Sequence, residues 1–378
     1  MMSKVLIISH SSVLSVNRKA YELLAKRGIE VVLIAPEKWP SGGLGNEYSF
    51  EPLTDTGLLK VYTCRPFFRG NGSLYFYSII FFRIIKNESP DFIFLDEEPW
   101  SLIALQTICA LKLVPQKKRP KLFIYTKQNI AKNYPVPFSL IEKWAHRSIL
   151  GAFVVSRECA DVLTTKGFKK EVMILPHGVD LELFRPLPNK NSPFITIGFV
   201  GRMVEAKGGL DLIEAFSIAI KEIPNLRLKF IGGGPDEDKW KNKVNTLKLS
   251  ELVDFCGPSN HNVIGKEIAQ LDILAVPSRT TPTWKEQFGR ILVESAACGV
   301  PVIASNSGAI PMVLESLGCG IIYNEKSIKD FSSCIIQLAK NKEERIKYAR
   351  AGFDNAKEKY CFDTIADKME HFFKCNEL

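Results

Sequence analysis

Two glutamates eight residues apart are the first candidates for chemistry in this chain. Glu286 lies in the loop after an expected buried strand, 273–277, and Glu294 lies more than one turn into the helix that follows. At a rise of about 1.5 Å per residue, the helical residues from Gly289 to Glu294 span roughly 7 Å. That span matches a diphosphate together with part of a ribose.

The start of this helix lies between the two acids. The backbone N–H groups of Phe288, Gly289 and Arg290 fall there, and a helix N-terminus favours an anion. A ligand that is negative in the middle and rich in hydroxyls at both ends fits this arrangement, and a nucleotide-sugar has that form. A plainer interpretation stays open, in which Glu286 only complements the helix dipole and Glu294 is only solvated.

The acids belong to a set of motifs in the C-terminal half. These are Pro277-Ser278, Glu286-Gln287-Phe288-Gly289, Glu294-Ser295-Ala296-Ala297-Cys298-Gly299 and Pro301-Val302-Ile303-Ala304. Together they resemble family 4 of the nucleotide-sugar glycosyltransferases, over nearly the whole C-terminal half and more weakly over the N-terminal half. The resemblance implies an α/β protein of the GT-B fold, with two Rossmann-like domains whose parallel sheets face each other across a cleft. It also implies sugar transfer with retention of the anomeric configuration.

The resemblance assigns roles to individual residues of the C-terminal half. Arg202 and Lys207, on a loop after a strand, would hold the donor diphosphate, although two solvated surface charges are the alternative. Glu286 would meet the sugar hydroxyls and act with these cations in catalysis, and Glu294 would meet the ribose. The expected donor-binding residues are Gly201, Phe288, Gly289, Arg290, Glu294, Gly257, Pro258, His261 and His10.

The acceptor side is less legible. Many family members have a histidine where this chain has Gln128, so a general base is not expected there. Gln128, Asn129, Glu97 and Glu98 are the acceptor-side candidates, although the two acids more simply belong to the start of a helix. His10 could contact the donor, or could instead have a capping or buried role.

No metal or cofactor is expected. Asp236 to Asp238 is an acid-x-acid triplet that could hold a divalent metal, but it follows Gly232-Gly233-Gly234-Pro235 and more simply provides the negative first turn of a helix. Met312 stands where the family usually has a glutamate, which could alter the choice of sugar.

The 378 residues favour two domains. We expect an acceptor-side domain at 1–178, a linker at 179–193 and a donor domain at 194–360, with the last helix, 361–378, packing back on the first domain. Apolar runs predict strands at Val5–Ser9, Val31–Ala35, Leu59–Thr63, Phe92–Leu95, Leu122–Tyr125, Phe153–Val155, Val172–Leu175, Thr196–Val200, Leu226–Ile231, Val253–Cys256, Ile273–Val276, Val302–Ala304 and Ile321–Tyr323. Helices are expected at Val16–Arg27, Leu74–Lys86, Pro99–Leu113, Phe138–Leu150, Glu158–Lys166 and, as a tail, Glu343–Lys374.

The charge is uneven along the chain. Residues 1–180 hold 24 Lys and Arg against 16 Asp and Glu, and the remainder holds 26 against 25. A basic N-terminal half favours an anionic acceptor or an anionic membrane surface that carries it. Helix 74–86 could lie on that surface, although a helix of the protein core is the simpler interpretation. A nucleic-acid partner is not expected, because the sequence has no nucleic-acid motif.

The chain opens without a signal peptide, and its longest apolar run, 74–85, is too short to span a bilayer. Its nine cysteines are scattered, as is typical of a reducing compartment. We therefore expect a cytoplasmic protein that contacts the inner membrane face peripherally.

The sequence thus predicts a retaining glycosyltransferase. It would move a sugar from a nucleotide-diphosphate sugar to a glycan or lipid-linked intermediate of envelope or surface polysaccharide synthesis. The alternatives are a non-catalytic GT-B protein that binds a nucleotide-sugar or glycan, and a basic nucleic-acid binder.

Overall fold

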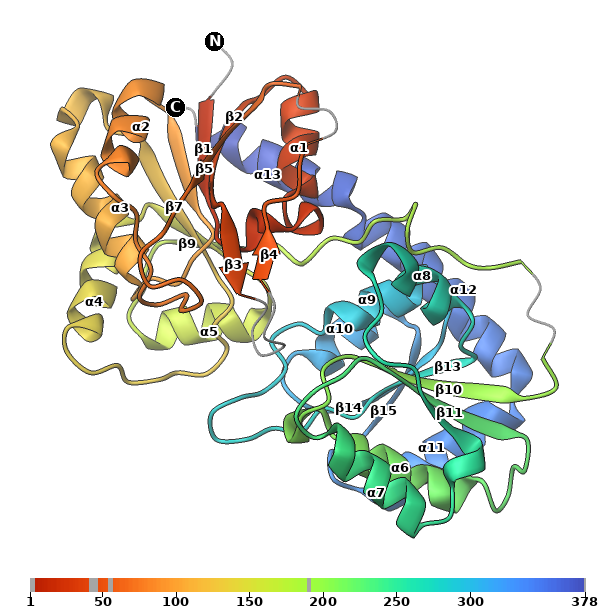
Figure 1. Ribbon diagram of the computed structural model, residues 1–378. Coiled ribbons are helices and arrows are strands. Elements are labelled where there is room, and N and C mark those ends of the chain that lie inside the picture. Colours follow the sequence, from red (N-terminus) through yellow and green to blue (C-terminus); the bar gives the residue numbers. More distant parts are fainter. Residues whose placement is uncertain (1–3, 41–46, 54–56, 189–191, 377–378) are drawn as a thin grey trace. The chain divides into compact units, whose positions relative to one another are not determined.

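The protein is described from a computed structural model (Figure 1). The structure describes residues 4–40, 47–53, 57–188 and 192–376. The first compact unit is Met1–Pro176 with Phe362–Leu378, and the second unit is His177–Cys361. Residues 189–191 of the expected linker lie outside the described residues, and the domain limits drawn from the sequence stay a prediction.

The first unit is built on a seven-stranded sheet in the order β5-β2-β1-β6-β7-β8-β9. All neighbouring strands pair in parallel, and the central strands are apolar on both faces because helices cover both sides. The strands are β1 (Lys4–Ile8), β2 (Glu30–Pro36), β5 (Leu59–Cys64), β6 (Phe92–Leu95), β7 (Lys121–Thr126), β8 (Gly151–Val154) and β9 (Glu171–Ile174). The strand order reverses between β1 and β6, and open α/β sheets bind ligands beside the carboxyl ends of the strands at such a switch point.

Helices cover both faces of this sheet. They are α1 (Lys19–Lys26), α2 (Ile80–Glu88), α3 (Leu102–Leu113), α4 (Phe138–Ser148), α5 (Arg157–Thr165) and α13 (Phe362–Cys375). Figure 1 shows α13 beside α1 on one face and α2, α3 and α4 on the other. A short antiparallel hairpin of β3 (Lys38–Pro40) and β4 (Glu47–Ser49) follows β2.

The second unit repeats this plan with a six-stranded sheet in the order β12-β11-β10-β13-β14-β15, whose switch point lies between β10 and β13. Its strands are β10 (Ile195–Val200), β11 (Leu226–Ile231), β12 (Val253–Phe255), β13 (Ile273–Val276), β14 (Val302–Ser305) and β15 (Gly320–Tyr323). Its helices are α6 (Gly209–Ala219), α7 (Glu237–Thr246), α8 (His261–Ala269), α9 (Arg290–Ala297), α10 (Ile310–Leu317), α11 (Ile328–Lys340) and α12 (Lys342–Tyr360). In Figure 1, α6, α7 and α11 cover one face and α8, α9, α10 and α12 the other.

Every strand expected from the sequence is present, but two helix predictions are wrong in part. The helix expected at 74–86 begins only at Ile80, because the Gln106 side-chain amide bonds both the N–H and the C=O of Tyr77 and holds that backbone out of a helix. The expected tail is two helices, α12 and α13, separated by the extended residue Cys361. Among the described residues, none of the helices has the length and hydrophobicity needed to cross a membrane.

Helix α13 completes the core of the first unit. The Phe372 ring lies 4.4 Å from the ring of Phe153 and 4.9 Å from that of Phe123, and the Phe373 ring lies 5.4 Å from that of Phe92. Both α13 phenylalanines are buried. The last residues of the chain therefore cover strands from the middle of the first sheet.

We predict that Phe373→Ala destabilises the first unit by about 3–5 kcal/mol, because it leaves a cavity against the sheet. Lys374→Ala, one residue further along α13, removes only an exposed pair with Glu370 and should change the free energy of unfolding by about 0.5 kcal/mol or less. Guanidinium denaturation followed by circular dichroism measures both. Equal stability of the two variants would contradict this role of α13.

Candidate functional site

The loops that follow β10 and β13 meet at the switch point of the second sheet. The Lys207 ammonium, from the loop after β10, lies 2.6 Å from Glu286 Oε2, from the loop after β13. The Ser278 hydroxyl donates to the same oxygen at 3.2 Å, and Lys207 also lies over the Trp284 ring at 5.0 Å. Two of the three predicted catalytic residues are thus in direct contact.

Two glycines make this approach possible. Gly208 has φ +68°, and a Cβ there would lie 1.8 Å from the carbonyl oxygen of Pro277. Gly308 has φ +54°, and a Cβ there would lie 2.1 Å from the carbonyl oxygen of Glu286. Any side chain at either position would push the loops apart, so the glycines set the place of the Lys207–Glu286 pair.

The loop that carries Glu286 is anchored by residues that the sequence did not point to. Arg279 makes a two-pronged ion pair with the buried Asp211 of α6, and its Nε donates at 2.7 Å. The Thr280 N–H donates to Glu325 at 2.6 Å. Because these partners are 45 or more residues away in the sequence, no local pattern could have revealed them.

The third predicted catalytic residue, Arg202, follows Gly201 at the same edge of the sheet and is exposed. In the part of the chain that the structure describes, no carboxylate pairs with its guanidinium. The loop at Gly257 and Pro258 lies beside it: the Gly232 N–H donates to the Gly257 carbonyl at 2.8 Å, and a Cβ on Gly232 would meet the Gly201 carbonyl. Helix α8 begins at His261, whose side chain lies outside what the structure describes.

Helix α9 begins at Arg290, with Gly289 as its N-cap. The Phe288 ring is buried, 5.4 Å from the ring of His177, so only its backbone is available for the predicted anion site. Glu294 lies in the second turn, with Arg290 Nη2 3.9 Å from its carboxylate. Burial raises the pKa of Glu294, and Arg290 offsets this only in part.

The acidic triplet is a helix start, as the sequence predicted. Asp236 is the N-cap of α7, and Glu237 and Asp238 lie in its first turn. Within the described residues, no group of His, Cys, Asp and Glu side chains is arranged to hold a metal ion. Met312 lies in the first turn of α10 and is half-buried.

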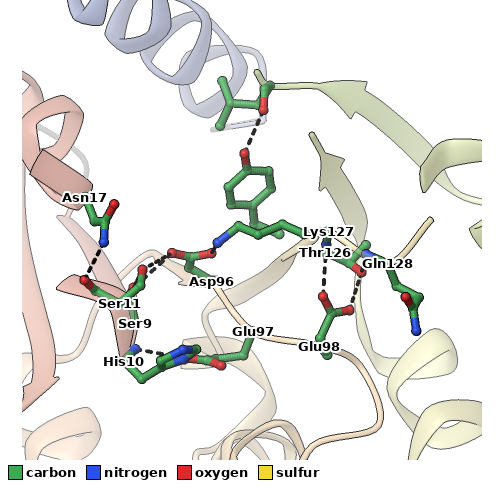
Figure 2. Close-up of polar contacts among 12 residues, drawn as sticks. Ser9, His10, Ser11, Asn17, Asp96, Glu97, Glu98, Thr126, Lys127 and Gln128 are labelled. Carbon is green, nitrogen blue, oxygen red and sulfur yellow. Dashed lines mark hydrogen bonds and ion pairs between the residues drawn. The ribbon is translucent and has the colours of Figure 1, made fainter. Parts of the chain in front are cut away.

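The switch point of the first unit carries a second polar cluster, at the carboxyl ends of β1, β6 and β7 (Figure 2). His10 Nδ1 lies 2.6 Å from Glu97 Oε1, and the His10 backbone N–H donates to the same oxygen. The buried Tyr75 hydroxyl donates to it as well, at 2.6 Å. The Glu97 side chain is only 2% exposed, so it orients His10 from the buried side of the ring and does not face solvent.

Asp96 and Lys127 form the centre of this cluster. The Lys127 ammonium lies 2.7 Å from Asp96 Oδ1, and the Ser9 hydroxyl donates to Asp96 Oδ2 at 2.9 Å. Figure 2 shows Glu98 on the far side of Lys127, accepting hydrogen bonds from the Thr126 hydroxyl and the Lys127 N–H. Burial raises the pKa of Glu98 to about 7, although both hydrogen bonds act to lower it.

The remaining acceptor-side candidates diverge. The Gln128 side-chain amide donates to the Tyr134 hydroxyl at 2.8 Å, and the Tyr134 ring stacks on Trp100. Asn129 is buried and donates to Glu158 of α5. The structure therefore gathers His10, Glu97, Glu98 and Gln128 at one edge of the sheet and directs Asn129 into the protein.

The chemistry of the two clusters differs. In the second unit, Arg202, Lys207 and the start of α9 offer positive charge for an anion, and Glu286 is an acceptor for hydroxyls. In the first unit, paired acids and a lysine surround His10 and a titratable Glu98. Neither arrangement resembles a nucleophile held by a general base.

Comparisons with known proteins agree with this reading. The model of the "Glycosyltransferase Family 4" domain matches residues 18–183, and that of "Glycosyl transferases group 1" matches residues 182–354. Over 98% of both chains, the structure is similar to sucrose-phosphate synthase from Thermosynechococcus elongatus, with a TM-score of 0.75 and 17% identity. It is also similar to HepE of Anabaena, solved with UDP, over 99% of this chain and 100% of that one, with a TM-score of 0.76 and 16% identity. The protein has the GT-B fold, which confirms the predicted fold class. It belongs to family 4 of the nucleotide-sugar glycosyltransferases.

Curated relatives match over part of their length. A GDP-mannose-dependent alpha-(1-6)-phosphatidylinositol monomannoside mannosyltransferase of Mycobacterium tuberculosis is 24% identical over 64% of this chain. A D-inositol 3-phosphate glycosyltransferase of Corynebacterium aurimucosum is 25% identical over 53%, and the phosphatidylinositol N-acetylglucosaminyltransferase gpi3 subunit of Schizosaccharomyces pombe is 31% identical over 43%. The matches span 65%, 51% and 35% of these relatives' own lengths.

We predict that Glu97→Gln lowers the pKa of His10. Burial alone lowers that pKa, but the charge and hydrogen bond of Glu97, together with the charge of Asp96, outweigh burial, so the pKa of native His10 is raised. A raised pKa means that protonated His10 stabilises the fold below the pKa of an unfolded histidine. That stabilisation is lost as the pH rises through the folded value, and the variant should lack it. Proton NMR titration, with His10→Gln to assign the resonance, measures the shift; an unchanged pKa would disprove the coupling.

Proposed function

We propose that this protein is a retaining glycosyltransferase that moves a sugar from a nucleotide-diphosphate sugar to an anionic, glycan or lipid-linked acceptor. The observation that carries the proposal is the Lys207–Glu286 pair at the switch point of the second unit, with the start of α9 directly after it. A diphosphate suits the cations and the helix start, and hydroxyls suit the two glutamates. Solved relatives bind UDP or UDP-glucose, and curated ones are named for GDP-mannose.

In the proposed reaction, the bond between the anomeric carbon and the diphosphate breaks as the acceptor hydroxyl bonds that carbon on the same face. The departing phosphate oxygen takes the hydroxyl proton, so Gln128 needs no basic nitrogen. Arg202 and Lys207 stabilise the charge that develops on the leaving diphosphate. Donor binding draws Lys207 toward the phosphates, and Glu286 then orients the sugar and favours positive charge at the anomeric centre.

The two carboxylates are not a general acid and a nucleophile in this proposal. Such a pair would flank one glycosidic bond with about 5–9.5 Å between the carboxyl groups. Here the N–H groups at the start of α9 lie between them in the sequence, so Glu286 serves the sugar and Glu294 the ribose. No divalent metal is required, because the two cations and the helix start supply the positive field.

The first unit would receive the acceptor. It holds 26 basic against 19 acidic residues, whereas the second unit holds 24 against 22. The names of the curated relatives specify phosphatidylinositol derivatives or inositol phosphate, which supports an anionic acceptor. A basic first unit would also be held against an anionic membrane face. All nine cysteines are free thiols, which suits a reducing compartment and supports the cytoplasmic side of that membrane.

The first test is a panel of UDP-, GDP- and dTDP-sugars, screened by thermal shift and then for donor hydrolysis or transfer in EDTA. A donor present at about 100 times its Kd should stabilise the protein by roughly 2.7 kcal/mol. Arg202→Ala should lower turnover by roughly 10²–10³-fold. Binding without turnover would favour a non-catalytic GT-B protein, and activity lost in EDTA but restored by Mg²⁺ or Mn²⁺ would overturn the metal-independent mechanism.

The second test separates the carboxylates. Glu294→Gln should mainly raise the donor KM, because contacts to the ribose are present equally in the ground and transition states. Glu286→Gln should mainly lower kcat. Burial raises the pKa of Glu294, so this carboxylate becomes protonated at a higher pH than an ordinary glutamate. Donor affinity should therefore begin to fall at that higher pH as the solution is acidified. This pH dependence should vanish in Glu294→Gln.

Steady-state kinetics with the donor varied measures both effects, and Glu315→Gln, an exposed glutamate of α10, is the control. An equal loss of kcat in Glu286→Gln and Glu294→Gln with KM unchanged would restore a paired-carboxylate mechanism.

A further inference from the structure

A separate cavity lies in the first unit, outside the polar cluster of Figure 2. It is open to solvent, has a volume of about 240 Å³ and is lined by Glu37, Lys38, Arg65, Pro66 and Arg69. We call it the cationic pocket, because three of its five lining residues are basic. No role in the reaction proposed above uses any of these residues.

The cations of this pocket are available to a ligand. Among the residues that the structure describes, neither Lys38 nor Arg65 has an ion-pair partner, and both are exposed. Arg69 pairs with Glu47 at 3.0 Å, but both side chains are 40% exposed, and a pair in that setting is worth little. Glu37 is the one acid that lines the pocket among the described residues, so the lining keeps an excess of positive charge.

The pocket lies at the edge of the sheet where the acceptor is proposed to bind. Glu37 and Lys38 directly follow β2, and Arg65 directly follows β5, so both sides of the pocket come from the carboxyl ends of parallel neighbouring strands. Trp39, the next residue along, packs its ring 4.6 Å from the ring of His10. One indole therefore separates the cationic pocket from the cluster at the switch point.

Exposed aromatic side chains adjoin the cations. Phe67 and Phe68, between the lining residues Pro66 and Arg69, are 53% and 64% exposed. Phe68 has φ +53°, a left-handed conformation that costs a bulky residue free energy and persists only where the surrounding structure holds it. The Phe67 ring stacks on Phe76 at 5.0 Å, and Phe67 and Phe76 also form an antiparallel bridge, which holds this turn outward.

We infer that the cationic pocket binds the phosphate of a lipid-linked acceptor, while Phe67 and Phe68 enter the apolar layer beside it. Lys38 and Arg65 bind the phosphate oxygens. The Arg65 guanidinium donates two hydrogen bonds in a fork, and the Lys38 ammonium acts as a point charge. The aromatic turn meets the lipid next to its headgroup, where amphipathic surfaces with flanking cations bind membranes. The inference rests on the proposed function, since it places the anionic end of the acceptor one tryptophan away from His10.

The chemistry favours an acceptor phosphate group with two negative charges, either a diphosphate that joins lipid to sugar or a separate monoester on the sugar, over a single bridging diester. Such a group carries more negative charge and more free oxygens than a single diester, and two unpaired cations can meet it together. Glu37 opposes any anion in the pocket. Its removal should therefore strengthen binding, an effect opposite in sign to the removal of the cations.

The test uses the full-length protein and phosphatidylcholine vesicles that carry either phosphatidic acid, a monoester, or phosphatidylglycerol, a diester, at matched surface potential. Wild-type protein should prefer phosphatidic acid. The double variant Lys38→Gln with Arg65→Gln should lose at least about tenfold of that affinity, because each removed charged hydrogen bond contributes to binding. Glu37→Gln should bind more tightly than wild type.

Two further variants make the result specific. Lys117→Gln with Lys118→Gln removes the same net charge from exposed positions at the amino end of β7, and should leave the preference for phosphatidic acid unchanged. Phe67→Ser with Phe68→Ser should weaken vesicle binding but leave the affinity for soluble glycerol 3-phosphate, measured by calorimetry, as in wild type.

The pocket would be overturned if the Lys38/Arg65 and Lys117/Lys118 double variants lost the same affinity for phosphatidic acid vesicles. It would also be overturned if wild-type protein showed no preference for the monoester. Tight binding of glycerol 3-phosphate with no effect of the phenylalanine variant on vesicles would overturn the lipid assignment and favour a soluble phosphorylated acceptor. Thermal shift with nucleotide-sugars on the same variants separates the two proposals. Retained donor binding beside a failed pocket refutes only the inference, and absent donor binding refutes the proposed function.

Discussion

The ion pair between Lys207 and Glu286 is the interaction on which the second unit's site depends. It joins the loops after β10 and β13, the two strands between which the sheet reverses its order. Parallel strands on either side of such a point send their connections to opposite faces, so their carboxyl ends open a crevice. Gly208 and Gly308 let backbone close around the pair, and the Arg279–Asp211 ion pair holds the loop between Ser278 and Glu286 to α6.

The sheet of the first unit also reverses its strand order, but different side chains lie at that switch point. Its reversal lies between β1 and β6, and His10 and Glu97 are each the second residue after one of these strands. In the second unit a cation, Lys207, is paired with a carboxylate, Glu286. In the first unit Glu97 accepts three hydrogen bonds from His10 and Tyr75 and faces inward. In the proposed function, the cluster of the second unit thus exchanges partners, whereas the cluster of the first unit fixes the orientation of the His10 ring.

The sequence was sufficient for the strands and for the identity of Lys207 and Glu286 as candidates. Strands buried on both faces are continuous apolar runs, which need no tertiary information to recognise. The contact between Lys207 and Glu286 was not predictable, because it depends on the strand order, and strand order is set by packing. Tyr75 was hidden for a related reason. Its segment has the pattern of a helix in the sequence, whereas in the structure the amide of Gln106, from α3, bonds the backbone of Tyr77, and Phe76 forms a bridge with Phe67.

The charge of the first unit shows why geometry is needed to interpret composition. Helix α13 and its tail bring more acids than bases to this unit, so the excess falls from the +8 of residues 1–180 to +7 for the whole unit. Lys127 contributes nothing to that excess, since it is paired with Asp96 inside the cluster. Lys117 and Lys118, in the densest basic stretch, precede β7 and so lie at the amino edge of the sheet, away from His10. The net charge of the unit therefore does not say where an anion binds, because salt screens the attraction between exposed charges over about 8–10 Å at ordinary ionic strength. Lys38 and Arg65 lie at the same edge of the sheet as the polar cluster. The position of these two cations, more than the number of basic residues in the unit, decides whether an anionic group comes within reach of His10.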